Sequence, residues 1–132
     1  MENFYLDSHG SGRIFCRIWA PDTPPKAVLQ IVHGIAEHTE RYDEFARFLT
    51  ARGFLVAAED HMGHGYSIGA DGIKGYFSGG WEAAAADSLA LQARLHEAYP
   101  ALPHFLLGHS MGSFLARTML FRAPQSGLRA AI

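Results

Sequence analysis

The sequence GHSMG at residues 108–112 carries the clearest chemistry in this chain. The pattern G-x-S-x-G marks a sharp turn between a strand and a helix that holds a serine hydroxyl outward as a nucleophile. The apolar run 105–107 precedes it and an amphipathic stretch follows it, which is the context that the pattern needs. Gly108 and Gly112 let neighbouring main chain approach where a Cβ atom would collide. We therefore interpret Ser110 as a nucleophile for acyl transfer rather than as an ordinary N-capping serine.

A serine hydroxyl is a poor nucleophile at neutral pH and needs a base that takes its proton. The residues after Ser110 contain no Asp, Glu or His. His109 adjoins the serine, but neighbouring side chains at the end of a strand point to opposite faces. His33, His61 and His64 are expected on loops near the same rim, and we assign none of them as the base. The sequence thus predicts a nucleophile without a proton acceptor.

The segment HGIAEHTERY, which begins with His33 and Gly34, follows an earlier apolar strand. In this kind of architecture a main-chain N–H of that loop joins the N–H after the nucleophile to form an oxyanion hole. The candidates are the N–H groups of Ile35 and Met111. Glu37 and Arg41 of the same loop are spaced i,i+4, and we interpret them as a solvated ion pair at a helix start, with a substrate contact as the alternative.

A second loop motif, DHMGHG at residues 60–65, begins with Asp60 and follows the next strand. The spacing of His61 and His64 could fit a metal, but the segment offers no clear third ligand. Gly63-x-Gly65 resembles part of a dinucleotide fingerprint, yet no helix opens directly behind it. We expect a rigid loop beside the site, in which both imidazoles hold main chain by hydrogen bonds, and we expect neither a metal nor a cofactor.

Strands alternating with helices must position these motifs. Residues 12–20 alternate as a half-buried strand, which we pair with residues 4–7 in an antiparallel hairpin. Apolar runs and amphipathic stretches then predict strands at 27–34, 54–60, 104–108 and 128–132, and helices at 39–52, 81–99 and 110–123. Such repeats specify a parallel sheet with helices on both faces, so the fold class is α/β.

Each expected helix has an apolar stripe that should face the sheet. The stripes are Tyr42, Phe45, Phe48 and Leu49 in the first helix, Ala84, Ser88, Leu91, Leu95 and Ala98 in the second, and Met111, Phe114, Leu115, Thr118 and Met119 in the third. Cys16 lies in the alternating strand and is expected to be a buried structural thiol.

Composition narrows the class of protein. With 132 residues, 48% of them hydrophobic and 18% charged, the chain is expected to form one globular domain at most. Eleven Lys and Arg against thirteen Asp and Glu give a net charge of −2, which argues against nucleic-acid binding. Cys16 is the only cysteine, the N-terminus lacks the features of a secretory signal, and the uncharged run 98–116 is broken by Pro and Gly. We expect a soluble, cytoplasmic protein without a transmembrane segment.

The segments HGIAEHTERY, DHMGHGYS and LLGHSMG, in this order, resemble the monoacylglycerol lipase and lysophospholipase branch of the α/β-hydrolases, also described as serine aminopeptidase-like. The resemblance runs from about Ile14 to the last residue. It implies Ser110 as the nucleophile, the N–H groups of Ile35 and Met111 as oxyanion donors, and ester hydrolysis of a lipid-like or other small acyl substrate without metal or organic cofactor. Ser113 departs slightly from the family pattern, which often has a second glycine there.

In this fold the catalytic triad runs Ser, then Asp or Glu, then His along the chain. The resemblance therefore places both partners, and the cap that shapes the acyl pocket, after Ile132. Residues 1–132 are expected to be the N-terminal part of a single α/β-hydrolase domain, truncated after the strand that follows the nucleophile helix. Alternatively, the chain is an inactive hydrolase that binds partners or a second copy through an open sheet edge, or a complementing polypeptide supplies Asp and His.

Overall fold

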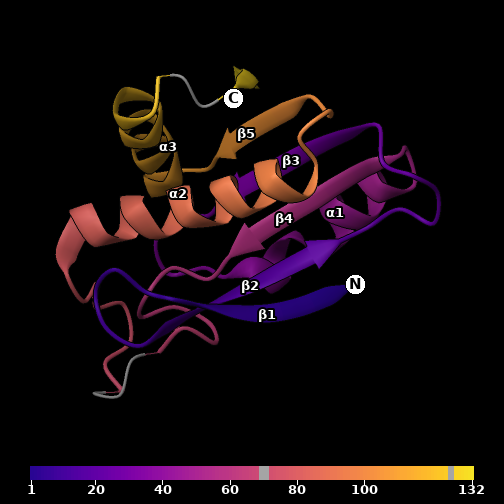
Figure 1. Ribbon diagram of the computed structural model, residues 1–132. Helices are drawn as coiled ribbons and strands as arrows, with labels where there is room; N and C mark the ends of the chain where they lie inside the picture. The colour runs from indigo at the N-terminus through magenta and orange to yellow at the C-terminus, as the bar shows by residue number, and fades with distance from the viewer. Residues whose placement is uncertain (69–71, 125–126) are drawn as a thin grey trace.

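The computed structural model describes residues 1–68, 72–124 and 127–132, in which one mixed sheet is covered by helices (Figure 1). The sheet order is β1-β2-β4-β3-β5-β6. The strands are β1 (Glu2–Asp7), β2 (Arg13–Trp19), β3 (Ala27–Val32), β4 (Phe54–Glu59), β5 (His104–Gly108) and β6 (Leu128–Ala131). The helices are the short 3-10 helix η1 (Thr39–Tyr42), α1 (Asp43–Thr50), α2 (Gly80–Ala98) and α3 (Met111–Arg122).

The strand pairing confirms the expected hairpin and parallel core. β1 and β2 pair antiparallel, with Phe4 opposite Cys16, and β2 also runs antiparallel to β4. β3 pairs parallel with β4 on one side and with β5 on the other, and β6 continues the sheet parallel to β5. Among the described strands, β6 forms the edge beside β5, the strand that leads to Ser110.

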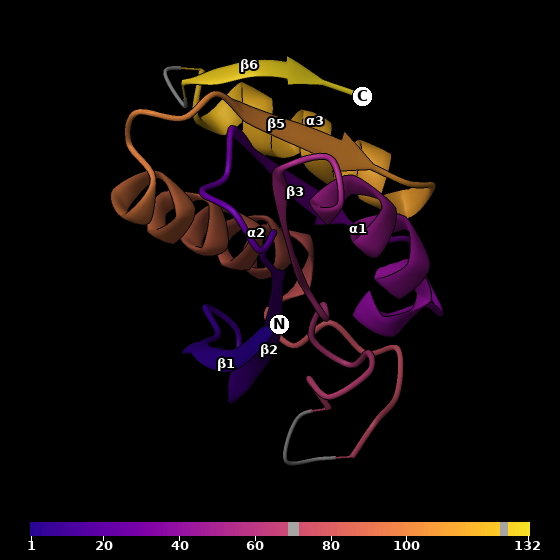
Figure 2. The same cartoon turned by 90° about the vertical axis from the view of Figure 1, so that its right-hand side faces the viewer.

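Alternating side chains of the central strands divide the core between two faces, because strand side chains have a period of two. Val28 and Val32 of β3 pack on the face that α2 and α3 cover, whereas Leu29 and Ile31 pack on the face of α1. Figure 2 shows α1 and α2 on opposite sides of the sheet. The chain therefore has the predicted three layers, with helices on both faces.

The predicted stripe of the first helix is wrong in part. Residues 39–42 form a 3-10 turn, and α1 begins only at Asp43. Ala46 is buried against the sheet, with Tyr42 and Leu49 packed beside it. Phe45 and Phe48 are instead 40% and 52% exposed.

The stripes of the two later helices need smaller corrections. Ala84, Ser88, Leu91 and Leu95 of α2 are buried as predicted, but Ala98 is exposed at the frayed end of the helix. In α3 the buried residues are Gly112, Leu115, Ala116 and Met119, whereas Phe114 is exposed. Gly112, in the first turn of α3, lies against the main chain of β3, and this close approach fixes the rotation of the helix.

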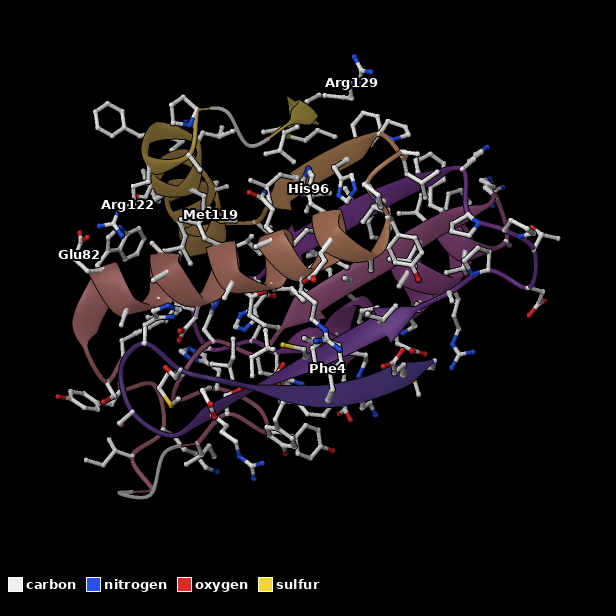
Figure 3. All side chains as sticks on the ribbon, viewed as in Figure 1. Phe4, Glu82, His96, Met119, Arg122 and Arg129 are labelled. Atoms are coloured by element: carbon white, nitrogen blue, oxygen red, sulfur yellow. The ribbon has the colours of Figure 1, made fainter. Side chains whose placement is uncertain are left out.

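Contacts between α2 and α3 hold in place the helix that follows Ser110. The Trp81 Nε1–H donates to Thr118 Oγ1 at 3.0 Å, and Arg122 pairs with Glu82. Figure 3 shows the Arg122 and Glu82 side chains meeting at the start of α2. These contacts lie beyond the first turn of α3 and join the two helices on the same side of the sheet.

A buried polar cluster lies between α2 and the sheet. Glu59, at the end of β4, is 0% exposed and accepts a hydrogen bond from the Ser88 hydroxyl. Gln30 Nε2 donates to the Ser88 carbonyl at 2.8 Å. Burial raises the pKa of Glu59 to about 8, and the hydrogen bond from Ser88, which lowers the pKa, offsets only part of this effect. Glu59 is therefore protonated at neutral pH in the folded chain.

Candidate active site

Ser110 lies on the sharp turn between β5 and α3. Its backbone has φ 54° and ψ −122°, in the left-handed half of the map where a non-glycine residue costs about 1–2 kcal/mol. The residue is exposed, and its hydroxyl makes no hydrogen bond to a described residue. It therefore does not cap α3 with its side chain. The turn holds a free hydroxyl outward at a measurable cost in backbone energy.

The glycines on either side of Ser110 allow this turn to pack closely. A Cβ on Gly108 would lie 2.6 Å from Gly112 O and 2.7 Å from Ser113 Cα. A Cβ on Gly112 would lie 2.0 Å from Val32 O, at the end of β3. The first turn of α3 thus rests directly on the main chain of β3, and any larger residue at Gly112 would push the elbow outward.

The loop that follows β3 lies against the elbow. A Cβ on Gly34 would be 3.0 Å from Ser110 Cβ and 3.2 Å from His109 O. No described residue accepts a hydrogen bond from the N–H of Ile35 or of Met111. Both candidate oxyanion donors are therefore free, one on the loop and one directly after Ser110.

His33 fixes the direction of the Ile35 N–H. His33 is fully buried; its Nε2 accepts the His61 N–H at 3.0 Å, so the ring proton is on Nδ1 and donates to Gly34 O at 2.7 Å. The Gly34–Ile35 peptide is trans, so its N–H points opposite to that held carbonyl. Ala36, directly after, has φ 59° and makes the turn that follows.

The three loop histidines form a buried group that holds main chain. His61 Nε2 lies 3.0 Å from His33 O, and His64 Nδ1 lies 3.2 Å from Met62 O. The His33 and His61 rings are 4.0 Å apart between centroids. Burial lowers the pKa of His33 to about 4 and that of His61 well below its ordinary value, so both are neutral at pH 7. Neither these rings nor His109 hydrogen-bonds the Ser110 hydroxyl.

Asp60 links the loop that follows β3 to the loop that follows β4 by hydrogen bonds. Its side chain is buried and accepts the Thr39 N–H at 2.6 Å and the Tyr66 N–H at 2.8 Å. A Cβ on Gly65 would lie 2.1 Å from Asp60 Oδ2, and one on Gly63 would lie 2.5 Å from Tyr76 O. The glycines therefore allow close packing of this loop. No phosphate-binding helix start follows them, since residues 63–68 contain no helix.

Glu37 is the residue at this site that the sequence interpretation missed. It does pair with Arg41, at 3.2 Å, but the expected solvated pair is wrong because Glu37 is only 6% exposed. Its Oε1 lies 2.7 Å from Nδ1 of His109 and accepts bonds from the Gly34 N–H and the Tyr42 hydroxyl. The usable signal was its spacing, three residues after Gly34, where a carboxylate can reach back to a main-chain N–H.

A cavity of about 490 Å³ lies between the two loops, beside the candidate oxyanion hole. Ile35 and Ala36 line it from one loop, and Gly63 and His64 from the other. Ser110 does not line this cavity. Across the described residues, no three His, Cys, Asp or Glu side chains gather as metal ligands, and no helix has the length and apolarity of a membrane span.

The sheet, the elbow serine and the loop against it define an α/β-hydrolase, and solved structures of that class match the chain. A carboxyl esterase from Bacillus coagulans superposes with a TM-score of 0.89 at 33% identity, covering 98% of this chain and 42% of the esterase. Residues 23–132 match the serine aminopeptidase S33 family of hydrolases, and the chain belongs to that family. The predicted fold class and family are thus confirmed.

Monoglyceride lipases are among the curated relatives of this chain. Human monoglyceride lipase is 43% identical over 103 residues, which cover 78% of this chain and 33% of the human protein. The monoacylglycerol lipase of Mycolicibacterium smegmatis is 40% identical over 103 residues, which cover 78% of this chain and 35% of that protein. The chain therefore spans about a third of the length of these relatives.

Proposed function

We propose that this chain carries the nucleophile and the oxyanion hole of a serine ester hydrolase. The observation that carries the proposal is the exposed, unbonded Ser110 hydroxyl on a strained turn, which precedes the free N–H of Met111 and lies against Gly34, the residue before the free N–H of Ile35. A strained residue persists only where its surroundings hold it, and such residues concentrate at active sites.

The reaction follows from this arrangement. Ser110 Oγ attacks the carbonyl carbon of an ester and passes its proton to a base. The carbonyl oxygen becomes negatively charged and accepts hydrogen bonds from the Ile35 and Met111 N–H groups. The alcohol leaves with a proton, and water then attacks the acyl-Ser110 intermediate to release the carboxylic acid. Each step is acyl transfer, with no change in oxidation state.

The base and the acid that orients it belong, in this proposal, to polypeptide outside residues 1–132. The chain would then be the N-terminal part of a single α/β-hydrolase domain, and the complementing part would supply Asp and His. The length of the relatives supports this, as does the absence of an imidazole bonded to Ser110 among the described residues. Alone, the chain keeps only oxyanion-hole and binding effects, so triad-dependent turnover is absent.

The substrate class in this proposal is a carboxylic ester with a lipid-like acyl chain. It rests on the names of the human and Mycolicibacterium smegmatis relatives, a monoglyceride lipase and a monoacylglycerol lipase. Acyl-chain length and head group would be set, in this proposal, by a cap that belongs to polypeptide outside residues 1–132. A cytoplasmic location remains a prediction from the composition.

Labelling with a fluorophosphonate tests the proposal. Ser110 Oγ forms a bond to phosphorus, fluoride leaves, and the proton passes to water or buffer. Intact-mass spectrometry over several hours should show slow, single labelling of the wild-type chain and none of Ser110→Ala. Equal labelling of both chains would remove Ser110 as the nucleophile, and complete labelling within minutes would show that the chain already holds a base.

An interaction module is the second candidate function, favoured by the open side of the sheet. β6 is the edge among the described strands, and a wholly apolar hollow of about 260 Å³ lies beside it on the α1 face. Phe105, Leu107 and Ile132 line this hollow together with Phe45 of α1. Sedimentation velocity separates the cases: concentration-dependent dimers would support the module, and a monodisperse monomer at all concentrations would contradict it.

A further inference from the structure

Glu37 is buried at a place where loop carboxylates are ordinarily solvated. Its side chain is 5% exposed, yet four groups lie within hydrogen-bonding or ion-pair distance of its two oxygens. The Gly34 N–H and the Tyr42 hydroxyl donate to Oε1, and His109 Nδ1 lies 2.7 Å from the same atom. Arg41 Nε lies 3.2 Å from Oε2. A carboxylate with this many partners is held in one position.

These contacts reach both halves of the candidate oxyanion hole. On the loop, Glu37 accepts the Gly34 N–H and so holds the His33–Gly34 peptide. His33 donates to the Gly34 carbonyl and so holds the Gly34–Ile35 peptide. Both peptide units around Gly34 are therefore fixed, and the second of them carries the Ile35 N–H. On the elbow, Glu37 holds the ring of His109, the residue immediately before Ser110.

The charge of Glu37 does not itself favour an oxyanion nearby, because like charges repel. Burial raises the pKa of this carboxyl, but the bonds from His109, Gly34 and Tyr42 outweigh burial and hold the pKa below its ordinary value. Glu37 is thus ionised, and Arg41 offsets its charge at 3.2 Å. Its contribution must come through geometry rather than through direct stabilisation of the reacting oxygen.

We propose that Glu37 is a positioning residue that fixes the oxyanion loop against the nucleophile elbow, so that the N–H groups of Ile35 and Met111 face one point. This inference rests on the proposed role of Ser110. The inference does not require the missing base. The oxyanion hole acts on the tetrahedral centre formed from an ester, or on the pentacoordinate centre formed from a fluorophosphonate, whichever group accepts the serine proton.

The test compares saturation kinetics of fluorophosphonate labelling in the wild-type chain, Glu37→Leu, Glu37→Gln and Glu40→Gln. Removing one oxyanion donor costs about 10²–10³-fold in rate. Loosening one donor should therefore slow the maximal labelling rate of Glu37→Leu by at least about tenfold, with the half-saturating probe concentration unchanged. Glu37→Gln keeps an acceptor oxygen for the Gly34 N–H and should recover most of the rate.

Glu40→Gln is the matched control, since Glu40 lies on the same loop but bonds Arg17 and Tyr66 away from the elbow. Its labelling rate should equal that of the wild type. In ¹H–¹⁵N spectra the Gly34 amide should move upfield in Glu37→Leu and stay close to its place in Glu40→Gln. A rate loss shared by Glu40→Gln would mean general loosening of the loop and would overturn the inference.

The outcomes separate the two proposals. If Ser110→Ala labels as the wild type does, the proposed function fails. If labelling is specific to Ser110 but Glu37→Leu matches the wild-type rate, this inference alone fails. Should Glu37→Leu not fold, His109→Ala carries the test, because that side chain is 59% exposed and its removal cuts only the contact to the elbow. Its maximal rate should fall about threefold, and an unchanged rate overturns the inference.

Discussion

The buried carboxyl of Glu59 should make the stability of this protein depend on pH. In the folded chain, burial raises the pKa of Glu59 from 4.5 to about 8. The folded state therefore keeps the proton over a range in which the unfolded chain has released it. The contribution of Glu59 to the free energy of unfolding therefore falls as pH rises from about 4.5 to about 8, by about 1.4 kcal/mol per pH unit, and is flat above that range. His33 and His61, which are neutral in the folded chain, act in the opposite direction below about pH 6.5, so the Glu59 slope is measured as a difference between variants.

Replacing Glu59 by Gln should remove this slope, because the amide has the same shape and does not ionise. Between pH 4.5 and pH 7 the contribution of Glu59 to the free energy of unfolding falls by about 3 kcal/mol, so the stability of Glu59→Gln relative to the wild type should rise by about that amount over the same range. The assay is urea unfolding of both chains at pH 5, 6, 7 and 8. His61, which lies 3.5 Å from Glu59 Oε1, is present in both chains, so the difference between them isolates Glu59.

Glu97→Gln, which makes the same change at an exposed position of α2, is the matched control. The reasoning is refuted if the stability difference between Glu59→Gln and the wild type is the same at pH 5 and pH 8. That result would mean that Glu59 is ionised in the folded chain, through contacts stronger than its bond from Ser88.

Substitutions at two further positions test the backbone of the site. Gly112→Ala places a Cβ 2.0 Å from Val32 O and should cost about 3 kcal/mol of unfolding free energy by urea titration; a loss below about 1 kcal/mol would show that the elbow can shift. Ala36 has φ 59°, so Ala36→Gly should stay within about 1 kcal/mol of the wild type in thermal unfolding, whereas Ala36→Val should lose about 2 kcal/mol. Equal stability of the two Ala36 variants would contradict the strained turn.

The fold was predictable because its signals are local and repeated. Each apolar run became a strand, the hairpin formed where residues 12–20 alternate, and parallel pairing followed from the helical crossovers. Helix rotation was less predictable. Phe45 and Phe48 fit a helical stripe, but Ala46 faces the sheet, with Tyr42 and Leu49 beside it. In so short a helix two neighbouring apolar stripes both have helical spacing, and periodicity alone does not select between them.

The motif residues of the candidate site could be selected from the sequence, whereas the buried carboxylates beside them could not. The elbow glycines, Ser110 and the loop histidines lie in short segments of recognisable spacing. Glu37 and Glu59 are acidic, and acidic residues are nearly always solvated unless paired. Their burial depends on partners distant in sequence, such as His109 for Glu37 and Ser88 for Glu59. Only the assembled sheet brings those partners together.

Chemical rescue by imidazole tests most directly whether Ser110 is an outward nucleophile that lacks only a base. The measurement is the rate of fluorophosphonate labelling at Ser110 as imidazole concentration increases, with Ser110→Ala reporting any reaction at other groups. Because the hydroxyl is exposed and unbonded, free imidazole can take its proton, and the labelling rate should rise in proportion to imidazole. A wild-type rate that does not change with imidazole would contradict the account.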